Sequence, residues 1–241
     1  MLGGEIRQPM FNLQTARLYT FVDTAYLGER TPEDVARALV DGGSDVIQLR
    51  AKGWPVAEIQ RVAEKLLPLT QPAGVGLVIN DHLAVARNCG APLCHLGQED
   101  FFGAGHGYVS ELTAGQSALE GRSEPAIGLS THSPDQARRA LAAGPAYIAI
   151  GPVYATATKP TARPVTLEYV RWAAAHVALP WFAIGGVNLE TLDDVLAAGA
   201  RRICVVSAIL NAPDIAKACQ RFRDRLVSAC PSEIENPRTE A

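Results

Sequence analysis

The chain has 241 residues, 48% of them hydrophobic, so it can bury one sizeable core. Its formal net charge of −3 argues against a polyanion-binding surface, and we expect no nucleic-acid partner. The sequence also lacks a signal-peptide pattern, a run of roughly 18 apolar residues and any Cys-x-x-Cys spacing among its five cysteines, which predicts a cytoplasmic protein with no membrane partner and no disulfide framework or zinc site.

Short apolar runs alternate with longer segments rich in Ala, Leu, Arg and Glu, which predicts alternating strands and helices. Eight strands alternating with helices imply parallel pairing, and eight strands close a barrel. The competing architecture is an open doubly wound sheet, but the Gly-x-Gly-x-x-Gly turn usual in that fold does not follow Val22. We therefore predict an α/β protein with a single (β/α)8 TIM barrel. The predicted strands are Leu18–Val22, Val46–Leu49, Gly76–Ile79, Leu93–Leu96, Ala126–Leu129, Tyr147–Ile150, Trp181–Ile184 and Arg202–Val206, and the predicted helices are Pro32–Asp41, Val56–Leu69, Leu83–Asn88, Pro134–Ala143, Thr166–Ala175, Leu189–Ala198 and Asp214–Val227.

Start signals support two of these helices, since Thr31-Pro32 and Ser133-Pro134 place a capping hydroxyl before a proline. We expect residues 1–16 to be an N-terminal extension, residues 17–228 to form the catalytic barrel, and residues 229–241 to be a flexible tail. The stretch Phe101–Pro125 is glycine-rich at its start and holds one short helical segment near Tyr108–Ala118. It is either a mobile lid or a long connection that contains the fourth helix.

Polar, charged or glycine residues follow the predicted strands, whereas the strand interiors contain almost none. In a barrel the loops after the strands gather at one end, where the chemistry takes place. This contrast predicts a catalytic mouth. The strings at the strand ends are QLRAK (48–52), INDH (79–82), HLGQED (95–100), GLSTH (128–132), GPVYATATK (151–159), IGGV (184–187) and VVSA (205–208).

Two strand ends suggest a phosphate site. Gly185 and Gly186 follow the seventh strand, and Ser207 follows the eighth at an expected helix start. Backbone N–H groups at such a position suit a phosphate dianion. The alternative is that the two glycines only form a tight turn.

Three cations suggest a second anion site. Arg50, Lys52 and Lys159 each lie just past a strand end, where their charges would repel one another unless an anion joined them. A diphosphate would serve. Taken singly, each is better explained as a solvated surface charge.

Asp81 and Asp100 end the neighbouring third and fourth strands. Two carboxylates near a polyphosphate suit Mg2+. An acid–base pair is the other chemical option, and Asp81 could simply cap the following helix. Of the five histidines, His95 and His132 flank the mouth and could hydrogen-bond a substrate, but no spacing indicates zinc or a Ser-His-Asp triad.

In their order along the chain, the strand-end strings resemble those of the thiamine phosphate synthase family, over about Arg17 to Leu226. The resemblance implies an Mg2+-dependent transferase that condenses 4-amino-2-methyl-5-(diphosphooxymethyl)pyrimidine with hydroxyethylthiazole phosphate. In this family diphosphate departs first, and the thiazole nitrogen captures the pyrimidine-methyl cation. The resemblance implies catalytic roles for Arg50, Lys52, Ser130 and Lys159, metal ligands at Asp81 and Asp100, and a substrate-binding set of Gln48, Leu49, Arg50, Ala51, Lys52, Asn80, Ser130, Thr156, Ala157, Thr158, Lys159, Gly186, Val206 and Ser207.

The chain departs from the family pattern at two positions beside the expected diphosphate site. Ala51 stands where the family usually has an acidic residue, and His82 stands where it often has arginine. The connection after Asp100 is also longer than usual. Two other functions are alternatives: a thiazole tautomerase-like isomerase of the same superfamily, and a non-catalytic binding protein of the thiamine pathway. A homodimer is a further expectation for such a barrel.

Overall fold

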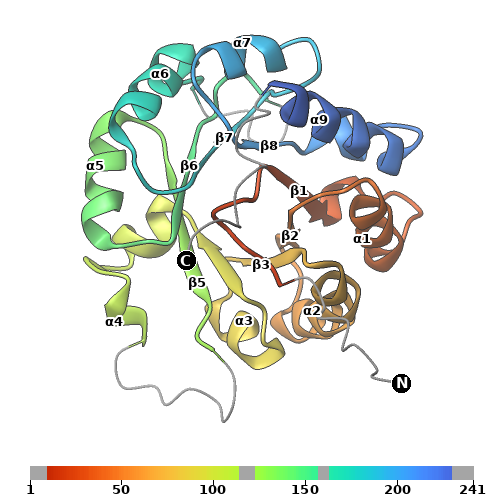
Figure 1. The fold of residues 1–241 in the computed structure, drawn as a ribbon. Coiled ribbons are helices and arrows are strands. Elements are labelled where there is room, and N and C mark those ends of the chain that lie inside the picture. Colours follow the sequence, from red (N-terminus) through yellow and green to blue (C-terminus); the bar gives the residue numbers. More distant parts are fainter. Residues whose placement is uncertain (1–9, 114–122, 157–162, 230–241) are drawn as a thin grey trace, which may run out of the picture.

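The structure is a computed structural model that describes residues 10–113, 123–156 and 163–229 (Figure 1). Eight parallel strands form a closed barrel in the order β1 to β8, and helices surround it, which confirms the predicted (β/α)8 fold. The strands are β1 (Leu18–Asp23), β2 (Val46–Arg50), β3 (Gly76–Asn80), β4 (Leu93–Leu96), β5 (Ala126–Thr131), β6 (Tyr147–Ile150), β7 (Trp181–Ile184) and β8 (Ile203–Cys204). The helices are η1 (Thr24–Tyr26), α1 (Pro32–Asp41), α2 (Val56–Thr70), η2 (Gln71–Ala73), α3 (Leu83–Cys89), η3 (Glu99–Gly103), α4 (Ser110–Thr113), α5 (Pro134–Ala143), α6 (Thr166–His176), α7 (Leu192–Ala197), α8 (Ser207–Leu210) and α9 (Ile215–Ala229).

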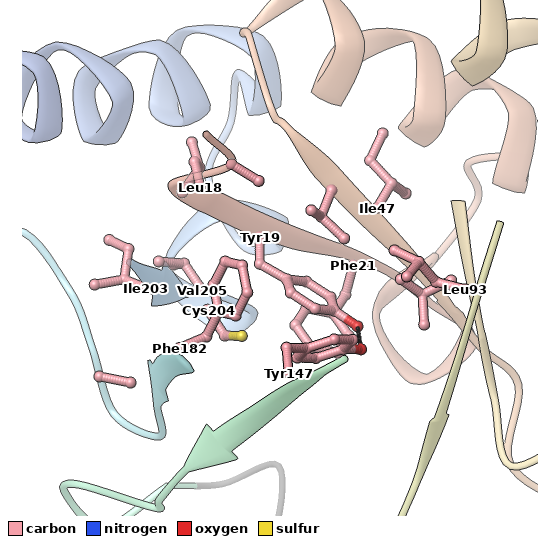
Figure 2. Packing of buried hydrophobic residues seen from close by; sticks show 14 of the residues in the cluster. Leu18, Tyr19, Phe21, Ile47, Leu93, Tyr147, Phe182, Ile203, Cys204 and Val205 are labelled. Atoms are coloured by element: carbon pink, nitrogen blue, oxygen red, sulfur yellow. Dashed lines mark hydrogen bonds between the residues drawn. The ribbon is translucent and has the colours of Figure 1, made fainter. Parts of the chain in front are cut away.

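The strands form because each is buried on both faces, against the helices outside and against other strands inside. Strand β1 is buried along its whole length, and the core continues through all eight strands. Figure 2 shows the interior, where large side chains from β1, β6 and β7 meet, among them Tyr19, Tyr147 and Phe182. Filling of this kind makes the barrel a packed core with its site at one end.

The two predicted capping signals are present. Thr31 Oγ1 accepts a hydrogen bond from Asp34 N at 3.1 Å, and Ser133 Oγ accepts one from Gln136 N at 3.2 Å. Each hydroxyl satisfies an N–H group that has no partner within the first helical turn. Proline follows each cap and begins the helix.

Some boundaries differ from the prediction for local reasons. Strands β1, β2, β3 and β5 extend one or two residues further, because the polar residues at their ends still pair with the neighbouring strand, as in Asp23 with Arg50. Helix α7 begins at Leu192 rather than at Leu189, since Asn188 Oδ1 accepts from the backbone N–H groups of Glu190 and Thr191 and holds a turn there.

Two segments outside the regular repeat are attached to the barrel. The ring of Phe11 lies against Gly76 at the start of β3, and Gln14 O accepts a hydrogen bond from Arg202 at 2.7 Å. After β4, Phe101 is fully buried, and Arg139 on α5 lies 3.9 Å from the ring centre of Phe102. The predicted lid or connection thus has its first part packed on α5, while residues 114–122 lie outside the described residues. No helix in the described part of the chain is both long and apolar enough to cross a membrane.

Candidate active site

A cavity opens at the carboxyl ends of the strands, and it receives side chains from the loops after most of them. This is the end at which TIM-barrel enzymes carry their sites. The cavity brings together residues that the sequence singled out separately. The predicted site residues that line it are Gln48, Arg50, Lys52, Asn80, Asp81, Asp100, Ser130, Thr156, Gly186, Val206 and Ser207.

Arg50 enters the cavity from the end of β2, and its position is fixed by an ion pair. Its Nη1 lies 2.9 Å from Oδ2 of Asp23, the last residue of the neighbouring β1. The Asp23 side chain is 1% exposed and that of Arg50 17% exposed, so the pair is largely out of water. A guanidinium presents several donors in a fixed plane. One edge of Arg50 is therefore held by Asp23 while its side chain lines the cavity.

Asp81 lies directly after β3 in a left-handed backbone conformation, with φ of 63°. Aspartate tolerates this region better than most residues. The Asp81 N–H donates to His95 O at 2.9 Å, which ties the turn to β4. Oδ2 of Asp81 accepts from Asn80 Nδ2 at 2.6 Å and forms an ion pair with Lys52 Nζ. The turn thus gathers a carboxylate, an amide and an ammonium group at one point of the rim.

Asp100 approaches the same cavity from η3, a single π-helical turn after β4. Its Oδ2 accepts a hydrogen bond from Gly97 N at 3.3 Å. Because β3 and β4 are paired neighbours, Asp81 and Asp100 follow adjacent strands into one cavity. Single π-helical turns are rare and often occur at functional sites.

The opposite side of the cavity is built mainly from backbone. Gly185 and Gly186 follow β7 with φ of 101° and 66°. A Cβ on Gly186 would lie 2.6 Å from Cβ of Tyr154, so both the conformation and the space require glycine here. Thr156, Val206 and Ser207 line the cavity beside this turn. We call the side with Arg50, Lys52, Asp81 and Asp100 the charged half, and the side with Gly185, Gly186, Val206 and Ser207 the glycine half.

The floor of the cavity is polar although it lies in the core. Gln48 is 3% exposed and His95 8% exposed, yet both line the cavity. His95 Nε2 lies 2.9 Å from Ser130 Oγ, which makes His95 a buried partner of a predicted site residue. His132 also lines the cavity, and its Nδ1 pairs with Gly151 O.

Some predicted site residues lie elsewhere. Leu49 in β2 and Ala51 directly after it are buried in the core and do not line the cavity, since they alternate along the chain with Gln48 and Arg50. Ala157, Thr158 and Lys159 lie outside the described residues. His82 immediately precedes α3 and makes no side-chain capping hydrogen bond.

Sequence reasoning missed Asp23. The predicted first strand stops at Val22, and the predicted site residues come only from the ends of the other seven strands. The available signal was the same one, because a carboxylate directly follows an apolar strand. Its partner could not be read from the sequence, since Arg50 lies 27 residues further along the chain.

The fold and the cavity define the chain as a (β/α)8-barrel protein whose cavity, lined by charged, polar and glycine residues, lies at the carboxyl ends of its strands. Comparison with known families makes this specific. The profile of the thiamine monophosphate synthase family matches residues 18–209. The chain belongs to this family, and its activity is that of a thiamine-phosphate synthase, a transferase.

Individual relatives agree with this assignment. The chain is 43% identical to a thiamine-phosphate synthase of Thermus thermophilus over 199 residues, which cover 82% of this chain and 90% of the relative. It is 36% identical to that of Lawsonia intracellularis over 215 residues, 89% and 94% of the two chains. Among solved structures, the thiamine phosphate pyrophosphorylase of Pyrococcus furiosus matches with a TM-score of 0.78 and 28% identity, over 90% of this chain and 99% of that one.

Proposed function

We propose that the chain joins 4-amino-2-methyl-5-(diphosphooxymethyl)pyrimidine to hydroxyethylthiazole phosphate, with release of diphosphate. The observation that carries this proposal is that the charged half and the glycine half open into one cavity. Two substrates, each bearing a phosphate group, must meet there with their reacting carbon and nitrogen atoms adjacent. Holding two reactants in one site converts a bimolecular reaction into an effectively unimolecular one.

The charged half suits the diphosphate. Arg50 is oriented by Asp23, so a guanidinium is available at the rim without having to be ordered when the anion arrives. Lys52 is 56% exposed and pairs with Asp81, so its long side chain can exchange that partner for a phosphate oxygen. Lys159 is the third cation that we assign to this group. Cations at the leaving oxygens stabilise the charge that develops there.

The carboxylates of this half suit Mg2+. The described residues that line the cavity include two carboxylates, Asp81 and Asp100. No group of three or more His, Cys, Asp or Glu side chains in the described ranges could hold a metal. Mg2+ usually takes one or two carboxylates and completes its octahedron with water and substrate oxygens. We propose that these two residues hold Mg2+. When bound, the ion would neutralise charge on the diphosphate.

The reaction that follows is a substitution at the methylene carbon of the pyrimidine. The carbon–oxygen bond breaks first, with its electron pair leaving on the diphosphate. The thiazole nitrogen then donates its lone pair to the resulting cation and forms the new carbon–nitrogen bond. No side chain needs to act as a nucleophile, and the roles of Arg50, Lys52, Ser130 and Lys159 are to hold and stabilise the departing group and the ring. Exclusion of water matters because water would capture the cation.

The glycine half suits the phosphate of the thiazole. The Gly185–Gly186 turn leaves its backbone exposed to the cavity, and Ser207 adds a hydroxyl. Backbone N–H groups in such a concave turn bind anions. We assign Thr156, Thr158, Gly186, Val206 and Ser207 to this substrate, with Ala157 between the two threonines.

The experiment that tests the function is direct. Purified protein is mixed with the pyrimidine diphosphate, the thiazole phosphate and Mg2+, and thiamine phosphate is measured. We expect product with Mg2+ and none with EDTA. An absence of product with Mg2+ would refute the proposed condensation. Equal product with EDTA would refute the metal requirement alone.

We further propose the cytoplasm as the compartment and a homodimer as the assembly. The four described cysteines are buried free thiols, as a reducing compartment allows. Light scattering coupled to size-exclusion chromatography measures the assembly, and a mass near 25.6 kDa would exclude the dimer.

A further inference from the structure

Beneath the cavity, five side chains from five strands form one buried hydrogen-bond chain. Gln48 Nε2 lies 2.7 Å from Tyr19 Oη, and Tyr19 Oη lies 3.1 Å from Tyr147 Oη. Tyr147 Oη lies 3.1 Å from His95 Nδ1, and His95 Nε2 lies 2.9 Å from Ser130 Oγ. Figure 2 shows the central link, with the hydroxyl groups of Tyr19 on β1 and Tyr147 on β6 pointing at one another across the barrel.

The buried hydrogen-bond chain can form because β5 leaves room for the ring of Tyr147. Gly128 is paired in register with Tyr147 on the neighbouring β6. A Cβ on Gly128 would lie only 2.1 Å from Cζ of Tyr147, so the ring occupies the space that any other side chain would need. Phe182 packs edge-on against the same ring at 5.7 Å. The tyrosine is thereby fixed between Tyr19 and His95.

The hydrogen atoms in this chain have a definite direction. The Gln48 amide nitrogen donates to Tyr19, so the Tyr19 hydrogen must go on to Tyr147, which is its other hydrogen-bond partner in the described residues. Tyr147 then donates to His95 Nδ1. Any other order leaves a buried hydroxyl hydrogen without an acceptor, which is costly.

The direction of these hydrogen bonds determines which ring nitrogen of His95 carries the proton. Since Nδ1 accepts from Tyr147, the single proton of the neutral ring lies on Nε2 and is donated to Ser130 Oγ. Burial raises the pKa of Tyr19 and of Tyr147 well above the usual 10.0, so both hydroxyl groups keep their protons. The Ser130 hydrogen is not needed within the chain and remains available to a ligand in the cavity.

The two ends of the buried hydrogen-bond chain therefore present an acceptor and a donor to the cavity. Gln48 is held with its nitrogen on Tyr19, which leaves its carbonyl oxygen as an acceptor, and Ser130 offers a donor. A 4-aminopyrimidine has the matching pattern, because its amino group donates and its ring nitrogens accept. A 4-oxopyrimidine has the opposite pattern at the same two positions, with an accepting oxygen and a ring N–H.

We infer that the buried hydrogen-bond chain couples Gln48 to Ser130 and sets the cavity to select an amino-substituted pyrimidine over its oxo analogue. Tyr19, Tyr147 and His95 act as positioning residues in this selection, which rests on the proposed function. To accept the oxo analogue, the Gln48 amide must turn over. Its oxygen would then face Tyr19, every hydrogen bond in the chain would reverse, and the His95 proton would move to Nδ1.

The first test measures the direction of the hydrogen bonds in the absence of substrate. Nitrogen-15 NMR of the histidine side chains reports which ring nitrogen carries the proton, and the His95 signals are assigned by their loss in His95→Gln. We expect His95 near neutral pH to be protonated on Nε2 alone. A proton on Nδ1, or on both nitrogens, would overturn the inferred direction. This result does not depend on whether the protein forms thiamine phosphate.

The second test measures the selection between the amino and the oxo pyrimidine. Tyr147→Phe removes the central hydroxyl group without altering a residue that lines the cavity. The measured quantity is kcat/KM for the 4-amino pyrimidine diphosphate divided by kcat/KM for the 4-oxo analogue. We expect this ratio to fall on the order of tenfold in Tyr147→Phe, because one hydrogen bond holds the orientation of the next. The KM for the thiazole phosphate should not change.

Tyr169→Phe is the matched control. Tyr169 on α6 is also buried, and its hydroxyl donates to Thr131 Oγ1 at 2.8 Å, outside the buried hydrogen-bond chain. Its removal should lower stability to a similar extent and leave the ratio unchanged. An unchanged ratio in Tyr147→Phe, or an equal fall in Tyr169→Phe, would overturn the selection. A wild-type protein that turns over neither pyrimidine contradicts the proposed function, and the NMR result then still decides the direction of the chain.

Discussion

The two halves of the cavity are built by different means. The charged half uses long side chains that are paired with one another in this structure, as Arg50 is with Asp23 and Lys52 with Asp81. The glycine half uses backbone, held open by a turn at Gly185 and Gly186 that has no room for a side chain. Side chains can change partners, whereas a backbone turn cannot. This difference supports our proposal that the charged half holds the group that departs, together with a metal, and that the glycine half holds a group that stays bound.

The largest effect should come from the part of the charged half that we propose to hold Mg2+. Asp100→Ala should lower kcat by a factor on the order of 10² to 10³, the loss seen when one electrostatic group of an active site is removed. The free energy of unfolding should change little, because Asp100 is exposed at the rim. Glu99→Ala is the control, since Glu99 lies in the same π-helical turn but does not line the cavity. A near wild-type kcat in Asp100→Ala would contradict the assignment of this residue to the metal.

The next effect should come from the partner that orients Arg50. Asp23→Asn leaves a largely buried guanidinium without its counter-charge. We expect the free energy of unfolding to fall by about 3 kcal/mol and kcat/KM for the pyrimidine diphosphate to fall about tenfold. Urea unfolding and steady-state kinetics measure the two quantities. Asp135→Asn breaks the exposed pair with Arg138 and should cost less than about 0.5 kcal/mol. Equal losses in the two variants would show that burial of the Asp23 pair is unimportant.

The glycine half should respond in a different kinetic constant. Gly186→Ala forces a left-handed conformation on alanine, at a cost of about 1–2 kcal/mol, and places a methyl group against Tyr154. We expect KM for the thiazole phosphate to rise about tenfold, with an unchanged Kd for the pyrimidine diphosphate. Gly144→Ala carries the same backbone strain, with φ of 76° and open space around it, at the far end of the barrel. If Gly144→Ala raised KM as much, the effect would be one of stability and not of the turn.

Whether a feature of the site can be predicted from the sequence depends on how far apart along the chain the interacting residues lie. Arg50, Asp81 and Gly186 could be found because each follows an apolar strand, and that pattern is local. The pairing of Lys52 with Asp81 joins residues 29 apart and depends on the register between β2 and β3. The register appears only when the barrel closes.

The contact between Tyr19 and Tyr147 under the cavity could not be predicted from the sequence for another reason. Tyr19 and Tyr147 are 128 residues apart and lie in strands that are buried on both faces. In such strands the alternation of apolar and polar residues that marks the inner face is absent. Both residues therefore read as ordinary core side chains, and only the closed barrel shows that their hydroxyl groups meet.

The smallest effect should come from the uncharged pair of Tyr19 and Tyr147 beneath both halves of the cavity. The raised pKa of Tyr147 means that the native chain keeps a proton that the unfolded chain loses above its usual pKa of 10.0, so stability falls as the pH rises beyond that value. At about pH 11 the wild type should have lost about 1.4 kcal/mol more than Tyr147→Phe, relative to about pH 9. Urea unfolding at both pH values measures this difference. Identical losses in the two proteins would show that the hydroxyl group ionises freely in the native state.

The division of labour between the two halves is tested most directly by calorimetric titration of inorganic diphosphate with Mg2+ into three proteins. We expect the wild type and Gly186→Ala to bind diphosphate with the same Kd, and Asp100→Ala to bind it at least about tenfold more weakly. Unchanged binding in Asp100→Ala, or an equal loss in Gly186→Ala, would contradict the assignment of the diphosphate to the charged half.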